Sequence, residues 1–401
     1  MESTKDEVKT TMIDQIKEAL NFVNPKLSRI FIPFVMKHPR YLAKAPAMMK
    51  QFYHCEDRRK EVLEQEGIMV PPIMILSITH LCNLRCKGCF AAALGNVSEM
   101  NEKATQPHMT IEDWDRVITE AAELGTYAFL IAGGEPFVFK GLLDLCAKHE
   151  DKLFLIFTNG TAVGEADYQK LKKMTNTGII VSVEGSKEIT DERRGEGIHE
   201  RAVGTAKKLG KAGILSGISV TITNRNYDYW MRETAVDEFI DEGLHLAFLT
   251  EYIPVAATED DGMKKDSTCS TSDPKISKAL CLDSGQRQQF REQVLKFKEE
   301  KQLFIIHSPG DEEVFGGCVS SGKGFAHINS LGDLTPCPVS DIATHNMRNS
   351  SFKEGLASRL FVELRENGHV LENTDGPCAL FEHQAEVEEL RKRLGAYKTG
   401  V

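Results

Sequence analysis

The stretch Thr79-His80-Leu81-Cys82-Asn83-Leu84-Arg85-Cys86-Lys87-Gly88-Cys89-Phe90 places three cysteines in the spacing Cys-x3-Cys-x2-Cys. Three thiolates at this spacing can hold three irons of a cubane iron–sulfur cluster and leave the fourth iron without a protein ligand. A zinc knuckle or a disulfide loop is the alternative, but a zinc site usually needs a fourth Cys or His nearby. His80 lies only two residues before Cys82, which is awkward for tetrahedral closure. The loop therefore predicts an iron–sulfur cluster whose open iron binds a small molecule.

Two predicted buried strands frame this loop. Residues 71–79 form an apolar run that ends before the first cysteine, and residues 128–132 form a second run followed by Gly133-Gly134-Glu135-Pro136. This combination of a cysteine loop with Gly-Gly-Glu-Pro resembles the radical S-adenosylmethionine (radical SAM) enzymes. The resemblance implies that Cys82, Cys86 and Cys89 are the catalytic, metal-binding residues of a 4Fe–4S cluster. It also implies that S-adenosylmethionine chelates the open iron through its amino and carboxylate groups.

The same resemblance assigns residues to the cosubstrate. The Gly-Gly-Glu segment is expected to meet the methionyl amino group, and polar residues at later strand ends are expected to meet the ribose and carboxylate. The residues assigned in this way are Phe90, Gly133, Gly134, Glu135, Asn159, Ser182, Glu184 and Arg194, with Thr223 as a further candidate. The chain departs from the family at Gly88, where an aromatic residue often precedes the third cysteine; the aromatic residue of this loop is Phe90.

Strands and helices alternate from residue 73 to about residue 252. Short apolar runs predict strands at 73–79, 127–132, 152–158, 178–183, 214–222 and 246–252, and helices at 110–125, 141–149, 165–175, 199–212 and 229–243. This βα repeat implies parallel strands. Polar residues follow all six strands, and chemistry in parallel α/β folds sits at the carboxyl ends of strands. An open flavodoxin-like sheet would show the same alternation, but the cysteine loop after the first strand favours a partial (β/α)6 radical SAM barrel.

The predicted fold is thus α/β, with additions on both sides of the barrel. We expect a helical N-terminal extension at 1–70, the radical SAM partial barrel at 71–253, a linker and helix at 254–300, and a small auxiliary-cluster domain at 301–401. Residues 254–283 are rich in Ser, Thr and Asp, which is typical of a flexible insertion, and a helix is expected at 285–300.

A second set of cysteines lies in the last third of the chain. Cys318 follows two glycines, Cys337 lies between two prolines, and Cys378 follows Gly-Pro, while residues 325–335 predict a β-hairpin. This pattern resembles the shortened "twitch" form of the SPASM auxiliary-cluster domains, which assigns these three cysteines to a second iron–sulfur cluster. Cys281, Cys269, His327 or the substrate could supply a fourth ligand. The alternative is that they are buried free cysteines, although their Gly- and Pro-rich loops are unlike apolar helix faces.

Composition limits the class of protein. The chain is 41% hydrophobic and 27% charged, with ten cysteines and a net charge of −10. No apolar run approaches the ~20 residues that cross a bilayer, and no secretory signal is visible. Cysteines in such a chain favour metal or redox use over disulfides. We therefore expect a cytoplasmic enzyme working under anaerobic conditions, with no nucleic acid as partner.

Residues 26–60 depart from this acidic balance. They hold nine Lys or Arg against two acidic residues, a balance of +7, interleaved with apolar residues. A basic amphipathic stretch can form a peripheral contact with an anionic membrane. We favour the simpler interpretation, a helical segment that packs on the barrel with its lysines in water.

The predicted function follows from the resemblance. A low-potential donor such as flavodoxin or ferredoxin would reduce the cluster. Reductive cleavage of S-adenosylmethionine would then give a 5′-deoxyadenosyl radical that abstracts hydrogen from a substrate. An auxiliary cluster favours maturation of a peptide or protein. The alternatives are oxidation or rearrangement of a small metabolite or cofactor precursor, and modification of a lipid.

Overall fold

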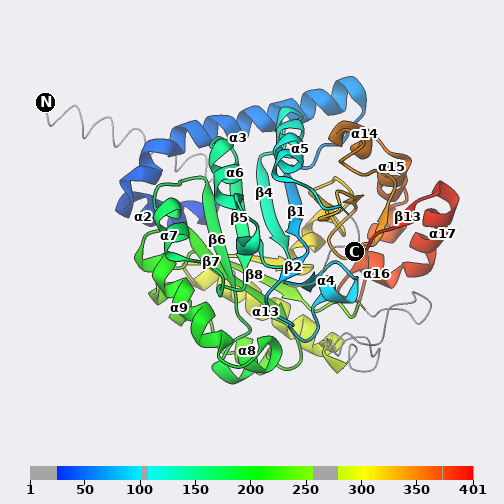
Figure 1. The fold of residues 1–401 in the computed structure, drawn as a ribbon. Coiled ribbons are helices and arrows are strands. Elements are labelled where there is room, and N and C mark those ends of the chain that lie inside the picture. The colour runs from blue at the N-terminus through cyan, green and yellow to red at the C-terminus, as the bar shows by residue number, and fades with distance from the viewer. Residues whose placement is uncertain (1–24, 101–106, 256–278, 373, 401) are drawn as a thin grey trace, which may run out of the picture.

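The computed structural model describes residues 25–100, 107–255, 279–372 and 374–400, and every structural statement below concerns these ranges. Their centre is a nine-stranded sheet in the order β11-β10-β1-β4-β5-β6-β7-β8-β9. The six predicted strands are its central ones and are all parallel. They are β1 (Ile73–Thr79), β4 (Ala128–Gly133), β5 (Leu153–Thr158), β6 (Thr177–Ser182), β7 (Ser216–Ile222) and β8 (Leu246–Glu251). The sheet is curled, with helices along its outer side (Figure 1), which confirms the partial barrel.

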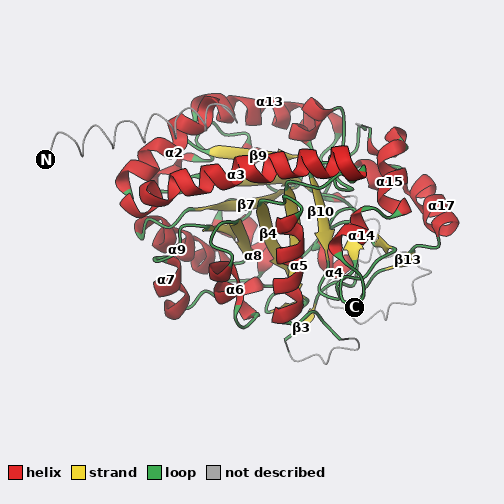
Figure 2. Ribbon diagram, turned by 90° about the horizontal axis from the view of Figure 1, so that it is seen from above, coloured by secondary structure: helices red, strands yellow, loops and turns green. Residues whose placement is uncertain are grey.

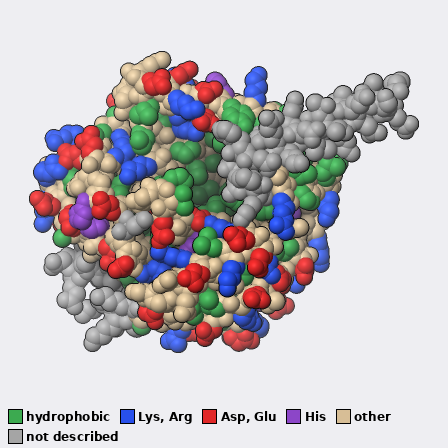
Figure 3. Space-filling model, turned by 180° about the vertical axis from the view of Figure 1, so that it is seen from behind, with side chains coloured by type: hydrophobic (Ala, Val, Ile, Leu, Met, Phe, Trp, Pro, Cys, Tyr) green, Lys and Arg blue, Asp and Glu red, His purple; other side chains and the backbone are tan. Residues whose placement is uncertain are grey.

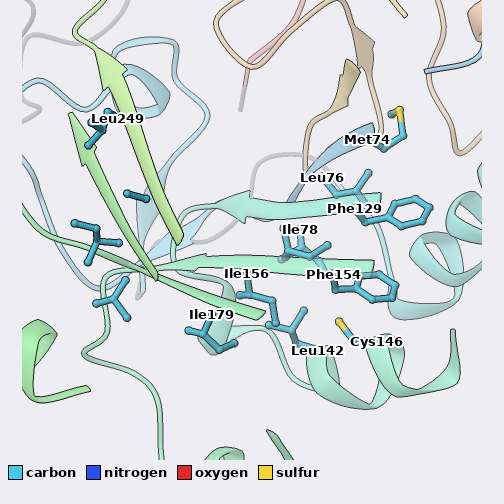
Figure 4. Close-up of a cluster of buried hydrophobic side chains, with 14 of the residues drawn as sticks. Met74, Leu76, Ile78, Phe129, Leu142, Cys146, Phe154, Ile156, Ile179 and Leu249 are labelled. Carbon is cyan, nitrogen blue, oxygen red and sulfur yellow. The ribbon is translucent and has the colours of Figure 1, made fainter. Parts of the chain in front are cut away.

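The outer face of the sheet supplies most of the core. It is covered by α5 (Ile111–Glu123), α6 (Leu142–Lys148), α7 (Glu165–Leu171) and α9 (Ile198–Lys211). Side chains from alternate strand positions, such as Leu76, Phe129 and Phe154, are fully buried and belong to one cluster with Leu142 and Cys146 of α6 (Figure 4). Burying each such side chain stabilises the fold by roughly 1.5–3 kcal/mol, so this layer holds the strands in place.

The inner face of the sheet is apolar near the amino ends of the strands. Leu155, Ile180, Leu246 and Phe248 form a separate buried cluster there, against which Phe31 of the N-terminal segment packs. Figure 3 shows a hollow on the side of the molecule opposite to that in Figure 1, with hydrophobic side chains inside it and charged side chains around it.

Three strands extend the sheet beyond the six predicted ones. At one edge β9 (Phe304–Ser308) pairs in parallel with β8, and at the other edge β10 (Phe325–Ile328) pairs in parallel with β1. The predicted hairpin is confirmed, because β10 pairs antiparallel with β11 (Leu334–Thr335). The sheet therefore continues into residues that the sequence pattern assigned to the region after the barrel.

The helices between and after the strands mostly match the prediction. The predicted helix at 285–300 is α13 (Ser284–Glu300). The predicted helix at 229–243 is instead two short ones, α10 (Tyr227–Trp230) and α11 (Asp237–Asp241). Buried Trp230 donates its indole N–H to the carbonyl of Glu184 at 3.0 Å, a tertiary contact of the kind that overrides helical propensity. Most of the predicted insertion, with Cys269, lies outside the described residues.

The N-terminal helices α2 (Pro25–Lys37) and α3 (Pro39–Glu66) lie across the amino edge of the sheet (Figure 1). Arg40 donates to the carbonyls of Lys172 and Gly213, which precede β6 and β7, and Arg59 donates to the carbonyl of Gly125, which precedes β4. Part of the basic charge at 26–60 is thus used to dock these helices on the barrel. Among the described helices, none combines the length and apolarity needed to cross a membrane.

The remaining elements are short and form two groups. Close to the cysteine loop lie β2 (Leu81–Cys82), α4 (Phe90–Ala93), β3 (Ser98–Glu99), η1 (Pro136–Val138) and α8 (Lys187–Arg194). Toward the C-terminus follow η3 (Gly310–Phe315), β12 (Ile342–Ala343), α14 (Phe352–Leu356), α15 (Arg359–Glu366), η4 (Gly368–Leu371), α16 (Ala379–Glu382), α17 (Gln384–Leu394) and β13 (Tyr397–Lys398). This C-terminal group lies at one end of the molecule, beyond β10 (Figure 2), and has a small core of its own.

Candidate iron–sulfur centres

The cysteine loop leaves β1 at its carboxyl end and returns toward the sheet. Cys82 lies in β2, which pairs with β3, and the carbonyl of Cys89 accepts the amide of Ala93 at 3.0 Å as α4 begins. Burial raises the pKa of Cys82 to about 12, and the neighbouring thiols of Cys86 and Cys89 add to this rise. Burial also raises the pKa of Cys86. Crowded thiols, two of which resist ionisation, suit a site where a metal stabilises the thiolates.

The Gly133-Gly134 pair brings the next strand end against this loop. The amide of Gly134 donates to the carbonyl of Thr79 at 2.8 Å, and the amide of Glu135 donates to the carbonyl of Leu81 at 2.9 Å. A Cβ on Gly134 would lie only 2.1 Å from the carbonyl oxygen of Leu81. Only glycine allows this approach, which places Glu135 beside the cysteine loop.

The carboxylate of Glu135 is 1% exposed and already accepts three hydrogen bonds. Its Oε1 accepts from the Thr158 hydroxyl at 2.7 Å and the Phe137 amide at 3.1 Å, and its Oε2 accepts from the Asn159 amide at 2.8 Å. Burial raises the pKa of Glu135, although these donors oppose the rise. A carboxylate has about four lone-pair positions, so there is room for one more donor.

Asn159 connects the end of β5 to the cysteine loop. Its side-chain amide donates to Oδ1 of Asn83 at 2.8 Å, and its own Oδ1 accepts from the amide and the hydroxyl of Thr161. Asn83 in turn donates to the Thr161 hydroxyl. These bonds hold the first cysteine of the loop at a fixed distance from β5.

A buried ion-pair network follows β6. Glu184 is fully buried, and its Oε1 accepts from Nε of Arg194 at 2.7 Å and also pairs with Arg193. Its Oε2 accepts from the amide of Thr221 at 3.2 Å. Nη1 of Arg194 approaches the Cys86 sulfur at 4.0 Å. Burial alone lowers the pKa of Arg194, but Glu184 and Cys86 raise it overall, so its positive charge is held beside the cysteine loop.

The other assigned residues are placed less directly. Ser182 ends β6 two residues after Ile180 and therefore shares the inner face of the sheet. Phe90 begins α4 and is 41% exposed. Thr223 instead hydrogen-bonds Asn226 in the turn after β7.

The structure adds residues that the sequence analysis missed. Arg193 pairs with Glu184, and the carbonyl of Arg193 accepts the Lys87 amide at 2.8 Å. Its position next to Arg194 in the sequence could have indicated this role. Tyr252, which follows β8, is 5% exposed, and a Cβ on Gly88 would lie 3.0 Å from its ring. An aromatic ring from β8 thus occupies the space beside Gly88.

Cys318, Cys337 and Cys378 come together although 60 residues of chain separate the first from the last. Burial raises the pKa of Cys318 to about 12 and that of Cys378 to about 11, and each thiol raises the pKa of Cys337 further. His327, one candidate for a fourth ligand, has both ring nitrogens engaged: Nε2 with Ser77 and Nδ1 with Thr335, each at 2.8 Å.

Comparison with known proteins identifies relatives of the chain. The Radical SAM superfamily model matches residues 76–238. The Fe-coproporphyrin III synthase of Methanosarcina barkeri is 31% identical over 39% of this chain, a match that spans only 38% of that protein. The pre-heme d1 synthase of Dinoroseobacter shibae is 25% identical over 78% of this chain and 80% of its own length. The sporulation killing factor maturation protein SkfB of Bacillus subtilis is 25% identical over 73% of this chain and 66% of its own length.

Solved structures support the fold. The crystal structure of Streptococcus suis SuiB bound to the precursor peptide SuiA has a TM-score of 0.59 and 17% identity, covering 81% of this chain and 71% of that one. At this identity the likeness concerns the fold.

Proposed function

We propose that Cys82, Cys86 and Cys89 hold a 4Fe–4S cluster and that S-adenosylmethionine binds there, because residues 76–238 match the Radical SAM superfamily model. The observation that supports this is the meeting of three half-buried thiols with Glu135 and Arg194 at the carboxyl end of the sheet. A cluster held there would supply one-electron reduction of the cosubstrate, the chemistry that leads to hydrogen abstraction from the substrate.

The chain's own residues would bind and orient the cosubstrate. The remaining lone pair of Glu135 would accept from the methionyl ammonium, beside the backbone of Gly133 and Gly134. Arg194 would place its charge beside the cluster, with Glu184 as a positioning residue for the guanidinium. Asn159 would position the loop through Asn83, while Ser182 and Phe90 would contact the cosubstrate from the inner face and from α4.

We further propose a second iron–sulfur cluster at Cys318, Cys337 and Cys378, in an auxiliary domain formed by residues 301–401. The mutual approach of the three thiols in a small separate core supports this assignment. A cluster held by three thiolates suits electron transfer or substrate binding. The rest of the chain would divide into the N-terminal extension at 1–70, the barrel at 71–253 and the linker with its helix at 254–300.

The substrate that we propose is a peptide or protein, and the reaction is its maturation. The 25% identity to SkfB over 73% of this chain supports this class. A cofactor precursor is the second candidate, favoured by the match to pre-heme d1 synthase along 78% of the chain. In the described part of the N-terminal segment, residues 25–66 form two helices that dock on the barrel.

One assay tests the enzyme and separates the two substrate classes. Reconstituted protein with dithionite and S-adenosylmethionine should release 5′-deoxyadenosine, detected by liquid chromatography and mass spectrometry. Short peptides encoded beside the gene, or Fe-coproporphyrin III as a tetrapyrrole probe, would then be added separately. The true class should speed release and show a mass change, and Cys86→Ala should abolish both. Release that persists unchanged in Cys86→Ala would refute the proposal.

Two partners complete the proposal. A cytoplasmic flavodoxin or ferredoxin would supply the low-potential electron. A peripheral membrane contact through residues 26–60 is the weaker interaction, because Arg40 and Arg59 already dock on the barrel. Salt-sensitive flotation with vesicles of anionic phospholipid would support such a contact, since surface attraction is screened over about 10 Å at 0.1 M salt.

A further inference from the structure

A carboxylate shares the pocket of the second cysteine set. Glu312 lies in η3, six residues before Cys318, and its carboxylate interacts with the Cys318 thiol. Its Oε1 accepts from the Ser308 hydroxyl at 2.9 Å, and its Oε2 accepts from the amide of Val319 at 3.3 Å. The carboxylate is therefore held against the backbone of the residue that follows Cys318, beside one of the three thiols.

The backbone between the two residues is built to hold this contact. The amide of Gly317 donates to the carbonyl of Glu312 at 3.2 Å, which closes the loop on itself. The amide of Cys318 donates to the carbonyl of Leu371 at 2.7 Å, which fastens the loop to η4. A Cβ on Gly317 would lie 2.1 Å from the same carbonyl oxygen, and its φ is +139°, so glycine is required.

The charges around Glu312 distinguish it from its neighbours. Asp311 pairs with Lys298 and Glu313 pairs with Arg291, whereas within the described ranges Glu312 has no salt-bridge partner. Burial raises the pKa of Glu312 and of Cys318, and the Glu312 charge adds to the rise at Cys318. Among the described residues, the Glu312 carboxylate thus lies beside the cysteine set without an ion-pair partner, an arrangement that a bound cation would stabilise.

Other candidates for a fourth ligand are less well placed. Both ring nitrogens of His327 already have hydroxyl partners. Cys281 follows Leu280, whose carbonyl accepts the amide of Asn224 after β7. Glu312 lies beside two members of the cysteine set, Cys318 and Cys378, and Glu382 lies beside Cys378.

We propose that Glu312 is the fourth protein ligand of the metal centre held by Cys318, Cys337 and Cys378, an inference that rests on the proposed second cluster. A carboxylate oxygen is a harder ligand than a thiolate and suits iron–sulfur iron less well. The iron that it binds is therefore the one most readily released to an incoming ligand. Glu312 would make this centre chemically asymmetric, with one exchangeable corner facing η3.

The experiment isolates the second centre. The first cysteine set is removed in a Cys82→Ala, Cys86→Ala, Cys89→Ala background, and the protein is reconstituted with ⁵⁷Fe. Iron and sulfide content, Mössbauer spectra and the EPR spectrum of the reduced centre are then measured with and without added cyanide. Glu312→Gln and Glu312→Cys are compared with Glu313→Gln, an adjacent exposed acid that pairs with Arg291.

We expect about four irons in the background protein, with a Mössbauer ratio of three irons to one distinct iron, as one oxygen ligand implies. Glu312→Cys should remove the distinct iron, and Glu312→Gln should bind cyanide at least tenfold more tightly. Glu313→Gln should behave like the background. Equal cyanide binding by the background and Glu312→Gln would overturn the ligand assignment alone. Absence of iron from the background protein would overturn the second cluster itself. The background protein alone gives this result, so it is distinguished from failure of the Glu312 assignment.

Discussion

Nη1 of Arg194 lies 4.0 Å from the sulfur of Cys86, although 108 residues separate them in the chain. The guanidinium is held there because Nε and Nη2 both bind one oxygen of buried Glu184, at 2.7 and 2.6 Å. A fixed positive charge beside a cluster ligand stabilises the reduced, more negative state of a metal centre. The end of α8 is in this way coupled to the cysteine loop.

Replacing Arg194 should therefore affect both stability and redox behaviour. Arg194→Met leaves Glu184 buried with only Arg193, so we expect a loss of about 3 kcal/mol in the free energy of unfolding, the lower end for a broken buried pair. The midpoint potential of the first cluster should also fall. Urea unfolding of the apoprotein and EPR-monitored redox titration measure the two effects.

Lys187→Met is the matched control on the same helix. Its ion pair with Asp191 is at the surface, with 55% of the lysine side chain exposed, so its loss should cost less than about 1 kcal/mol. Equal stability of the two variants would show that the Glu184 network is not a buried constraint.

The iron content should divide between the two cysteine sets. Anaerobically reconstituted native protein should hold about eight irons, and the Cys82→Ala, Cys86→Ala, Cys89→Ala protein about four, as two cubane clusters require. Colorimetric iron and sulfide assays measure this. A native protein that never exceeds four irons would remove the second cluster.

Much of this arrangement was predictable from sequence. All six central strands were predicted within two residues of their observed bounds, because short apolar runs separated by amphipathic helices specify buried parallel strands. The cysteine loop and Gly133-Gly134-Glu135 were found by spacing, and the structure brings them together through backbone hydrogen bonds.

What the sequence did not reveal depends on side-chain direction. Glu184 was assigned to the cosubstrate, but the structure uses its carboxylate to hold Arg193 and Arg194. Glu251, the polar residue that ends β8, likewise forms ion pairs with Arg287 and Arg291 of α13. Strand periodicity predicts where a polar residue lies. It does not predict which side chain of a helix distant in the sequence will form an ion pair with that residue. Glu312 was missed for the same reason.

Glu135 should prove structural as well as functional. Glu135→Ala leaves the Thr158 hydroxyl and two backbone amides without their acceptor, each costing about 1–3 kcal/mol when buried. We therefore expect a clear fall in melting temperature together with weaker S-adenosylmethionine binding, measured by equilibrium dialysis. Glu165→Gln, which loses a surface pair with Lys208, should change neither. Weaker binding with unchanged stability would show that the three hydrogen bonds contribute little.

His327 should make the apoprotein sensitive to acid. Burial lowers the pKa of His327 to about 3, below its ordinary value of 6.5, so the unfolded chain binds more protons than the folded protein between these values. The contribution of His327 to the free energy of unfolding is therefore fully present above pH 6.5 and falls as the pH is lowered toward 3. For one titrating group, this free energy changes by at most about 1.4 kcal/mol per pH unit. His327→Gln should flatten this slope in urea unfolding between pH 5 and 7, whereas His369→Gln, at an exposed site, should not.

Gly134 should be the least replaceable glycine of the site. Gly134→Ala puts a Cβ 2.1 Å from the carbonyl oxygen of Leu81, in backbone that cannot move without shifting Cys82. We expect a protein that still folds, because the outer core is untouched, but that loses iron from the first cluster and releases no 5′-deoxyadenosine. Gly204→Ala in α9 is the control, since nothing lies within 4 Å of its added Cβ. That change should raise stability by roughly 0.5–1 kcal/mol through helix propensity. Full iron content in Gly134→Ala would show that the loop tolerates displacement and that the close approach of β4 is not what positions the cysteines.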